Sequence, residues 1–99
     1  MIKSFADKET ERLFGGRKSR VVPPQVRERA LSKLLVLNAA TDVEDLQTPP
    51  SNRLEKLRGD REGQWSVRIN QQQCVCFSFE GGDAYNAQIV DYPREEESP

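Results

Sequence analysis

Five basic side chains lie close together in the middle of the chain, at Arg53, Lys56, Arg58, Arg61 and Arg68. Two glycines, Gly59 and Gly63, fall between them. Residues 53–70 are therefore predicted to form two strands joined by a glycine-containing turn. Cationic side chains presented by a strand pair can bind phosphate groups through charge-assisted hydrogen bonds. Nucleic acid is the first partner that this pattern indicates.

The overall charge is not that of a uniformly basic nucleic-acid binder, because the formal net charge is −1. Acidic residues are concentrated at 42–45 and in the tail, residues 94–99. Without that tail, 14 basic and 13 acidic residues remain, a net charge of +1. A second group of bases consists of Arg17, Lys18, Arg20, Arg27 and Arg29. The charge distribution therefore predicts two basic surface regions.

Length and composition indicate one folding unit. The chain has 99 residues, 35% hydrophobic and 31% charged, and no Gly-rich or Ser-rich linker divides it. We expect a single domain over residues 1–93 and a disordered acidic tail over residues 94–99. No apolar run approaches the length of a membrane span, and the first residues lack the apolar segment of a secretory signal. A cytoplasmic protein without membrane contact is expected.

The cysteines predict neither a disulfide nor a metal site. Cys74 and Cys76 are two apart in an apolar run, so as strand residues they share one face and cannot easily pair with each other. Zinc would need four ligands with recognisable spacing, and the chain has no histidine. We therefore expect two small buried residues and no cofactor.

Helix signals occupy the first half of the chain. Asp7 is a good cap for a helix that Gly15 and Gly16 end, and residues 2–5 before it could form a short strand. Pro23 and Pro24 are suited to the start of a second, longer helix. Its apolar stripe comprises Val26, Ala30, Leu31, Leu34, Leu35 and Leu37. A capping box of Thr41 and Glu44 predicts a short third helix over residues 42–46.

The second half alternates with the period of strands. The predicted inward residues are Trp65, Val67, Ile69, Val75, Phe77, Phe79, Tyr85 and Ile89. Three strands joined by short turns, with residues 53–58 as a fourth, make an antiparallel meander. The sequence thus predicts an α+β fold in which the N-terminal helices cover one face of a small antiparallel sheet. Arg68 is expected on the open face.

The chain resembles HigB-type toxins, a branch of the RelE/ParE superfamily of bacterial toxin-antitoxin modules. The residues that carry the resemblance are LEKLRGDREGQWSVRIN at 54–70, Phe77, GDAY at 82–85 and IVDY at 89–92, together with residues 2–5, 10–14 and 37–40. The resemblance implies a RelE-like fold and ribosome-dependent cleavage of messenger RNA. It also implies neutralisation by a HigA-like helix-turn-helix antitoxin, through which alone operator DNA would be contacted.

The same resemblance implies roles for particular residues. Arg58 matches the basic residue before Gly59 and Asp60, and with Lys56 and Arg61 it would bind RNA. Arg68 is not matched to the family pattern, but because it is expected on the open sheet face it could stabilise the reacting phosphate. Asp91 and Tyr92 match the family's residues beside the reaction centre. Two positions depart from the pattern: Cys74 stands where the family usually has arginine, and Pro93 where it usually has histidine. Cleavage is therefore expected to be slower than in relatives that carry both residues.

Two other functions stay open at this point. A catalytically weakened relative could still bind the antitoxin and act in regulation, and the changes at Cys74 and Pro93 favour this reading. A ParE-like gyrase inhibitor would share the fold and act by binding alone. Residues 54–70 resemble HigB more closely than ParE, so the gyrase inhibitor ranks last.

Overall fold

The computed structural model describes residues 1–19 and 22–91. Arg20, Tyr92, Pro93 and the acidic tail, residues 94–99, lie outside this part of the chain. Within the described residues, no helix is both long and apolar enough to cross a bilayer.

The first helix, α1 (Lys8–Phe14), begins and ends as its sequence predicts. The carboxylate of Asp7 accepts a hydrogen bond of 2.8 Å from the Thr10 amide, which satisfies a free donor at the helix start. Gly15 ends the helix, and Gly16 follows with a φ of 84°, a left-handed conformation that suits glycine. The hydroxyl of Thr10 accepts a 3.0 Å hydrogen bond from the Ile89 amide and so fixes α1 to the sheet.

The second helix, α2 (Pro24–Ala39), begins at the predicted prolines and buries one stripe. Ala30, Leu34 and Leu37 are buried at the i, i+4, i+7 spacing of one helix face. The inclusion of Leu35 in that stripe is wrong, because its side chain is 51% exposed. The buried stripe is therefore narrower than the apolar pattern of the sequence.

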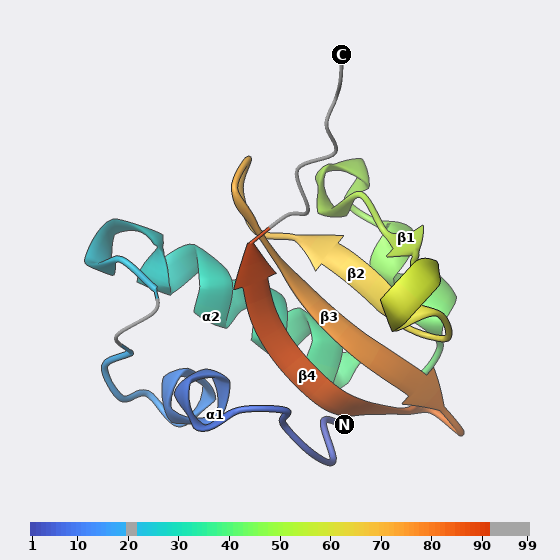
Figure 1. Ribbon diagram of the computed structural model, residues 1–99, viewed down its shortest axis with the longest axis horizontal. Coiled ribbons are helices and arrows are strands. Elements are labelled where there is room, and N and C mark those ends of the chain that lie inside the picture. Colours follow the sequence, from blue (N-terminus) through green and yellow to red (C-terminus); the bar gives the residue numbers. More distant parts are fainter. Residues whose placement is uncertain (20–21, 92–99) are drawn as a thin grey trace.

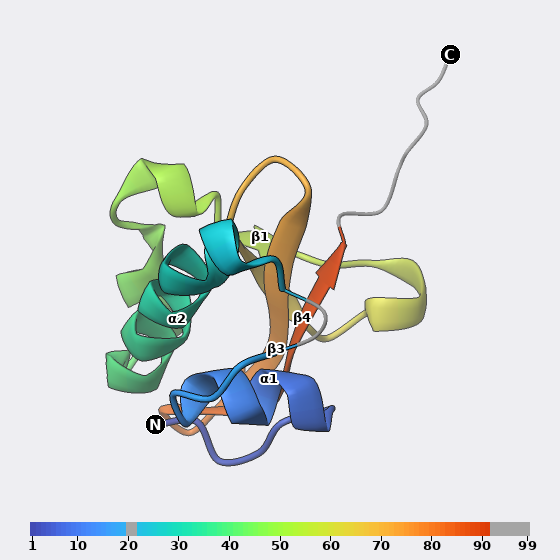
Figure 2. The ribbon, with the colours of Figure 1, turned by 90° about the vertical axis from the view of Figure 1, so that its left-hand side faces the viewer.

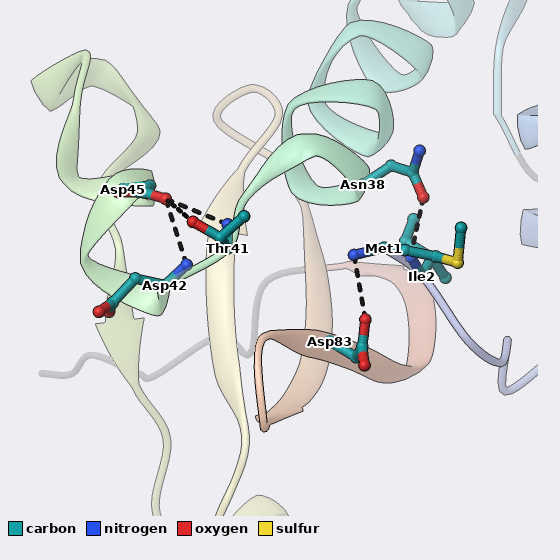
Figure 3. A network of polar contacts seen from close by, with 7 residues as sticks. All are labelled: Met1, Ile2, Asn38, Thr41, Asp42, Asp45 and Asp83. Atoms are coloured by element: carbon teal, nitrogen blue, oxygen red, sulfur yellow. Dashed lines mark hydrogen bonds and ion pairs between the residues drawn. The ribbon is translucent and has the colours of Figure 1, made fainter.

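A short 3-10 helix, η1 (Val43–Gln47), stands where the third helix was predicted, but its cap differs from the prediction. The capping residue is Asp42 and its partner is Asp45, not Thr41 and Glu44. The Asp45 carboxylate accepts from the amides of Thr41 at 3.1 Å and Asp42 at 3.2 Å, as Figure 3 shows. A carboxylate thus satisfies both free amides, and the cap lies one residue later.

Another 3-10 turn, η2 (Pro50–Asn52), ends on a buried asparagine that joins this region to α2. The Asn52 amide group donates to the carbonyls of Leu46 at 3.1 Å and Thr48 at 3.3 Å. Its oxygen accepts from the ammonium group of Lys33. All the polar atoms of this buried side chain are therefore paired, as burial requires.

Four antiparallel strands form one sheet in the order β1-β2-β3-β4, which confirms the predicted meander (Figure 1). The strands are β1 (Glu55–Lys56), β2 (Trp65–Arg68), β3 (Gln73–Glu80) and β4 (Asp83–Asp91). The first of them is shorter than the predicted segment 53–58. Residues 2–5, predicted as a strand, make only two isolated parallel bridges to β4, Ile2 to Ala84 and Phe5 to Ala87.

The N-terminus lies against β4 and α2. The terminal ammonium group pairs with the Asp83 carboxylate at 3.3 Å, and the Ile2 amide donates to the side-chain oxygen of Asn38 at 2.8 Å (Figure 3). These contacts hold the first two residues of the chain against the start of β4 and the last turns of α2.

An irregularity in β4 reverses one predicted orientation. Cys76 pairs with Gln88 and Ser78 pairs with Tyr85, so β4 has one more residue than β3 over this stretch. Asn86, at a φ of 56°, lies inside the bulge. Tyr85 consequently shares the face of Ser78, away from α2, and the prediction that it points to the helices is wrong. Ala84, Ala87 and Ile89 are the buried residues of this strand.

The layers are seen edge-on in Figure 2: α2 covers one face of the sheet, and the segment between β1 and β2, with the 3-10 turn η3 (Gly59–Arg61), lies on the other. This confirms the α+β class with helices against an antiparallel sheet. The buried core includes Leu13, Leu34, Leu37, Leu46, Val67, Val75, Phe77 and Ile89. The opposite face is not fully open to solvent, because Ser66, Cys74 and Cys76 on it are each at most 2% exposed.

Candidate functional site

A cavity of about 590 Å³ is lined by Ser66, Cys74 and Cys76 of the sheet face opposite α2 and is here called the open-face cavity. Its lining combines strand residues with the segment between β1 and β2. The residues are Glu55, Leu57, Arg58, Asp60, Arg61, Ser66, Cys74, Cys76, Val90 and Asp91. Residues more than 30 positions apart in sequence are therefore brought to one place.

The strand register places the sulfur atoms in this cavity. Ser66 pairs with Cys76, and Arg68 pairs with Cys74, so the open-face residues of β2 and β3 lie side by side. The two sulfurs are 3.9 Å apart and hydrogen-bonded. That hydrogen bond lowers the pKa of Cys76, burial opposes the shift, and Arg61 adds to it. The same hydrogen bond and burial raise the pKa of Cys74.

Arg61 is held over the sheet by two glutamine side chains. Its guanidinium donates to Gln64 at 3.0 Å and to Gln88 at 3.4 Å. The amide group of Gln88 in turn donates to Asp7 at 3.4 Å. Asp7 also caps α1, so this chain of polar contacts connects the helix start with the turn that carries Arg61.

The turn between β1 and β2 depends on its glycines. Gly59 has a φ of 67° and Gly63 a φ of 94°, both in the region that other residues rarely adopt. Arg58 immediately precedes this turn and is exposed, whereas Asp91 ends β4 and is also exposed. Both line the open-face cavity. Two guanidinium groups and a carboxylate near solvent are thereby available to one ligand.

Of the predicted site residues that the structure describes, three lie together, and Lys56 and Arg68 lie elsewhere. Arg58, Arg61 and Asp91 line the open-face cavity. Arg68 lines a different cavity of about 810 Å³ beside α2, together with Arg29 and Lys33; it is here called the α2 cavity. Tyr92 lies outside the described residues.

Local contacts explain the position of Arg68. It is the last residue of β2, and its Nε donates to the carbonyl of Asn70 at 3.2 Å in the turn that follows. Burial, and secondly the charge of Arg29, lower the pKa of Lys33 in the same α2 cavity. Positive charge is thus concentrated there as well.

Lys56 also lies apart from the open-face cavity. Its ammonium nitrogen is 5.5 Å from the centre of the Trp65 ring, a cation–π distance, and it lines a smaller hollow with Arg58. Because Lys56 pairs with Trp65 and Glu55 with Ser66 in the register, successive residues of β1 belong to opposite faces of the sheet.

Sequence reasoning missed several residues of the cavity. Glu55 and Asp60 add negative charge to a lining expected to be basic, and Gln88 positions Arg61. The alternation that places Ser66, Cys74, Cys76 and Gln88 on one face was visible in the sequence. That the turn at 59–63 lies over them was not. Among residues 1–19 and 22–91, no group of three or more His, Cys, Asp or Glu side chains is arranged to hold a metal ion.

The fold and the cavity define a small α+β protein with a charged hollow on the sheet face opposite its long helix. The sequence model of the HigB-like toxin family, described as the RelE-like toxin of the type II toxin-antitoxin system HigB, matches residues 3–93. The chain belongs to this family. Toxins of such systems are paired with an antitoxin, so an antitoxin is a partner of the chain.

Two relatives cover nearly the whole chain. A protein of Vibrio cholerae serotype O1 named Toxin HigB-1 is 33% identical over 90 residues, which is 90% of this chain and 95% of the relative. A protein of Proteus vulgaris named Endoribonuclease HigB is 36% identical over 92 residues, 93% of this chain and 99% of the relative. The similarity therefore extends over the strands that build the cavity.

Proposed function

We propose that the chain is the toxin of a type II toxin-antitoxin module and that it cleaves messenger RNA on the ribosome, inhibiting translation. The observation that supports this function is the meeting of Arg58, Arg61 and Asp91 in one cavity, in a chain similar to a protein named Endoribonuclease HigB. A cytoplasmic location and a HigA-like helix-turn-helix antitoxin, with operator DNA contacted only through it, belong to the same proposal.

The proposed reaction is internal attack of a ribose 2′-hydroxyl on the neighbouring phosphate: the new P–O bond closes a 2′,3′-cyclic phosphate, the bond to the 5′-oxygen breaks, and that oxygen leaves with a proton. Arg61 and Arg58 stabilise the additional negative charge of the crowded phosphate, and Arg61 is held for this role by Gln64 and Gln88. The carboxylate of Asp91 accepts the hydroxyl proton or orients the group that does so. Tyr92, next in the chain, stacks on a base or transfers a proton.

RNA extends beyond the cavity in this proposal. Lys56 beside Trp65, and Arg68 with Arg29 in the α2 cavity, are cations outside the lining of the open-face cavity. They bind backbone phosphates and take no part in proton transfer. Arg68, assigned to the reacting phosphate from the sequence, pairs with Cys74 on the open face and also lines the cavity beside α2, and in this proposal it binds a backbone phosphate there.

A ribosome-dependent cleavage assay tests the function. Purified protein is incubated with a messenger RNA with and without ribosomes, and the new 5′ ends are mapped. We expect cuts that depend on the ribosome and fall at a fixed position relative to codons. Arg61→Gln should lower the cleavage rate by about 100-fold or more, the typical loss for one transition-state charge contact. Arg17→Gln, at an exposed arginine near α1, is the matched control and should cleave like wild type.

A weakened toxin that acts in regulation is the second candidate. The observation that favours it is the position of Cys74, which lines the cavity with a neutral thiol where the family usually has a cation. No cleavage by wild-type protein, together with binding of the antitoxin, would establish this alternative. Damage to DNA without RNA cuts would instead indicate a gyrase inhibitor.

A further inference from the structure

We propose that Cys74 and Cys76 form a two-thiolate binding site for a cuprous ion. They are the only cysteines of the chain, they share one face of β3, and both line the open-face cavity. Binding of copper is independent of the proposed RNA cleavage.

The distance between the sulfurs fits a shared ion. The two Sγ atoms are 3.9 Å apart. Metal–thiolate bonds measure about 2.3 Å, so two sulfurs of one tetrahedral ion lie about 3.8 Å apart, and a wider bond angle separates them further. A cuprous ion held by two thiolates alone favours a wider angle than a tetrahedral ion, so on binding the sulfurs would move somewhat further apart than 3.9 Å through small side-chain rotations. A disulfide is a poorer fit, because its S–S bond of about 2.05 Å would require the sulfurs to move together.

The number of ligands favours copper in its monovalent state over zinc. A structural zinc ion takes four protein ligands, and the described residues hold no group of three or more suitable side chains. Thiolates are soft ligands that select cuprous copper, for which two thiolates form a complete set. The chain has no histidine, so no imidazole competes for the ion.

The binding step balances in atoms and in charge. Two S–H bonds break, two Cu–S bonds form, two protons pass to solvent, and copper stays in the +1 state without any oxidant. The bound group carries a net charge of −1. The guanidinium of Arg61 lines the same cavity as both sulfurs. Arg61 therefore stabilises the anionic complex.

Competition with a coloured cuprous chelator tests the proposal. Reduced, untagged protein is titrated under anaerobic conditions into the cuprous complex of bicinchoninate, and loss of colour reports transfer of the ion. We expect one copper per chain for wild type and loss of this transfer in Cys74→Ser, Cys76→Ser and the double variant. X-ray absorption of the loaded wild-type protein should show two sulfur neighbours at one copper, a result that needs no variant to fold.

A control variant tests whether copper binding requires two adjacent cysteines or only two cysteines on the same sheet face. Combining Cys76→Ser with Ser78→Cys keeps two cysteines on the same sheet face, but four residues, or about 13 Å, apart. This variant should not take the ion from the chelator. Transfer equal to wild type in this control or in the double serine variant would overturn the proposal. So would no transfer to wild type, or one copper shared by two chains in a dimer.

Discussion

The guanidinium of Arg61 donates a hydrogen bond of 3.4 Å to the side-chain oxygen of Gln88, which connects the turn between β1 and β2 with the last strand. The same glutamine donates to Asp7, the cap of α1. A cation of the open-face cavity is thus positioned by residues that lie 27 and 54 positions away in sequence. Preorganisation of this kind determines how well a charge stabilises a transition state.

Gln88→Ala should lower the rate of RNA cleavage while it reduces the stability of the fold only slightly. The substitution removes two hydrogen bonds of 3.4 Å. Because both are long, each is placed at the lower end of the usual range of roughly 0.5–1.5 kcal/mol, so together they contribute about 1 kcal/mol to the free energy of unfolding. Without this contact Arg61 samples more orientations, and hydrogen exchange in residues 59–64 should increase. Gln72→Ala, at an exposed position of the turn after β2, is the control. Unchanged exchange and cleavage in Gln88→Ala would contradict the positioning role.

Cys74→Arg should raise cleavage by at least about tenfold, because it adds a cation inside the cavity where one phosphate contact is typically worth 100-fold or more. The measurement is the initial rate in the ribosome assay. Ser78→Arg places the same charge on the same sheet face but outside the cavity lining and should have no such effect. Combination with Pro93→His tests both departures from the family together. Equal rates in wild type and the double variant would exclude these positions from catalysis.

Asn86→Val should destabilise the protein by about 1–3 kcal/mol, the usual cost of a left-handed conformation at an unsuited residue. Asn86 has a φ of 56°, and a β-branched side chain crowds the backbone there. Asn86→Gly keeps the conformation accessible and should cost far less. Urea unfolding of the two variants gives the comparison. A valine variant as stable as the glycine variant would show that the bulge does not require this conformation.

The pKa of Cys76 should be higher in Cys74→Ala than in Cys74→Ser. The hydrogen bond from residue 74 lowers the pKa of Cys76, and serine retains a donor whereas alanine has none. Only one thiol remains in each variant, so ultraviolet absorption of the thiolate during a pH titration reports it alone.

The same shift predicts how stability depends on pH. A thiol whose folded-state pKa is lower contributes stability above that pKa, and the contribution is lost as the pH falls through it. The stability of the serine variant relative to the alanine variant should therefore rise with pH between their two pKa values and stay constant below them. A difference that does not change with pH would exclude the hydrogen bond as the cause.

Much of the architecture was predictable because it depends on neighbours in sequence. The Asp7 cap, the Gly15 stop, the start of α2 at its prolines and the alternation of β2 and β3 follow from local backbone chemistry and period. The capping box was predicted one residue too early, because two pairs of adjacent residues have capping-box spacing. The structure uses Asp42 and Asp45 rather than Thr41 and Glu44.

The positions of site residues depended on tertiary structure. One extra residue at the β4 bulge places Tyr85 on the open face. Arg68 and residues of the turn after β2 line the α2 cavity, whereas Asp91 lines the open-face cavity. Neither outcome has a local signal, because a bulge and a cavity result from pairing between distant strands.

The sequence by itself determined the α+β class, the faces of the central strands and the basic turn that carries Arg58 and Arg61. Only the tertiary structure decided which side chains meet. It brings Arg61 into hydrogen-bonding contact with Gln88 and places two thiols in the same cavity as Arg61. The physical reason is range: backbone conformation and side-chain period act over a few residues, whereas the meeting of side chains depends on strand register and on how the turn folds over the sheet.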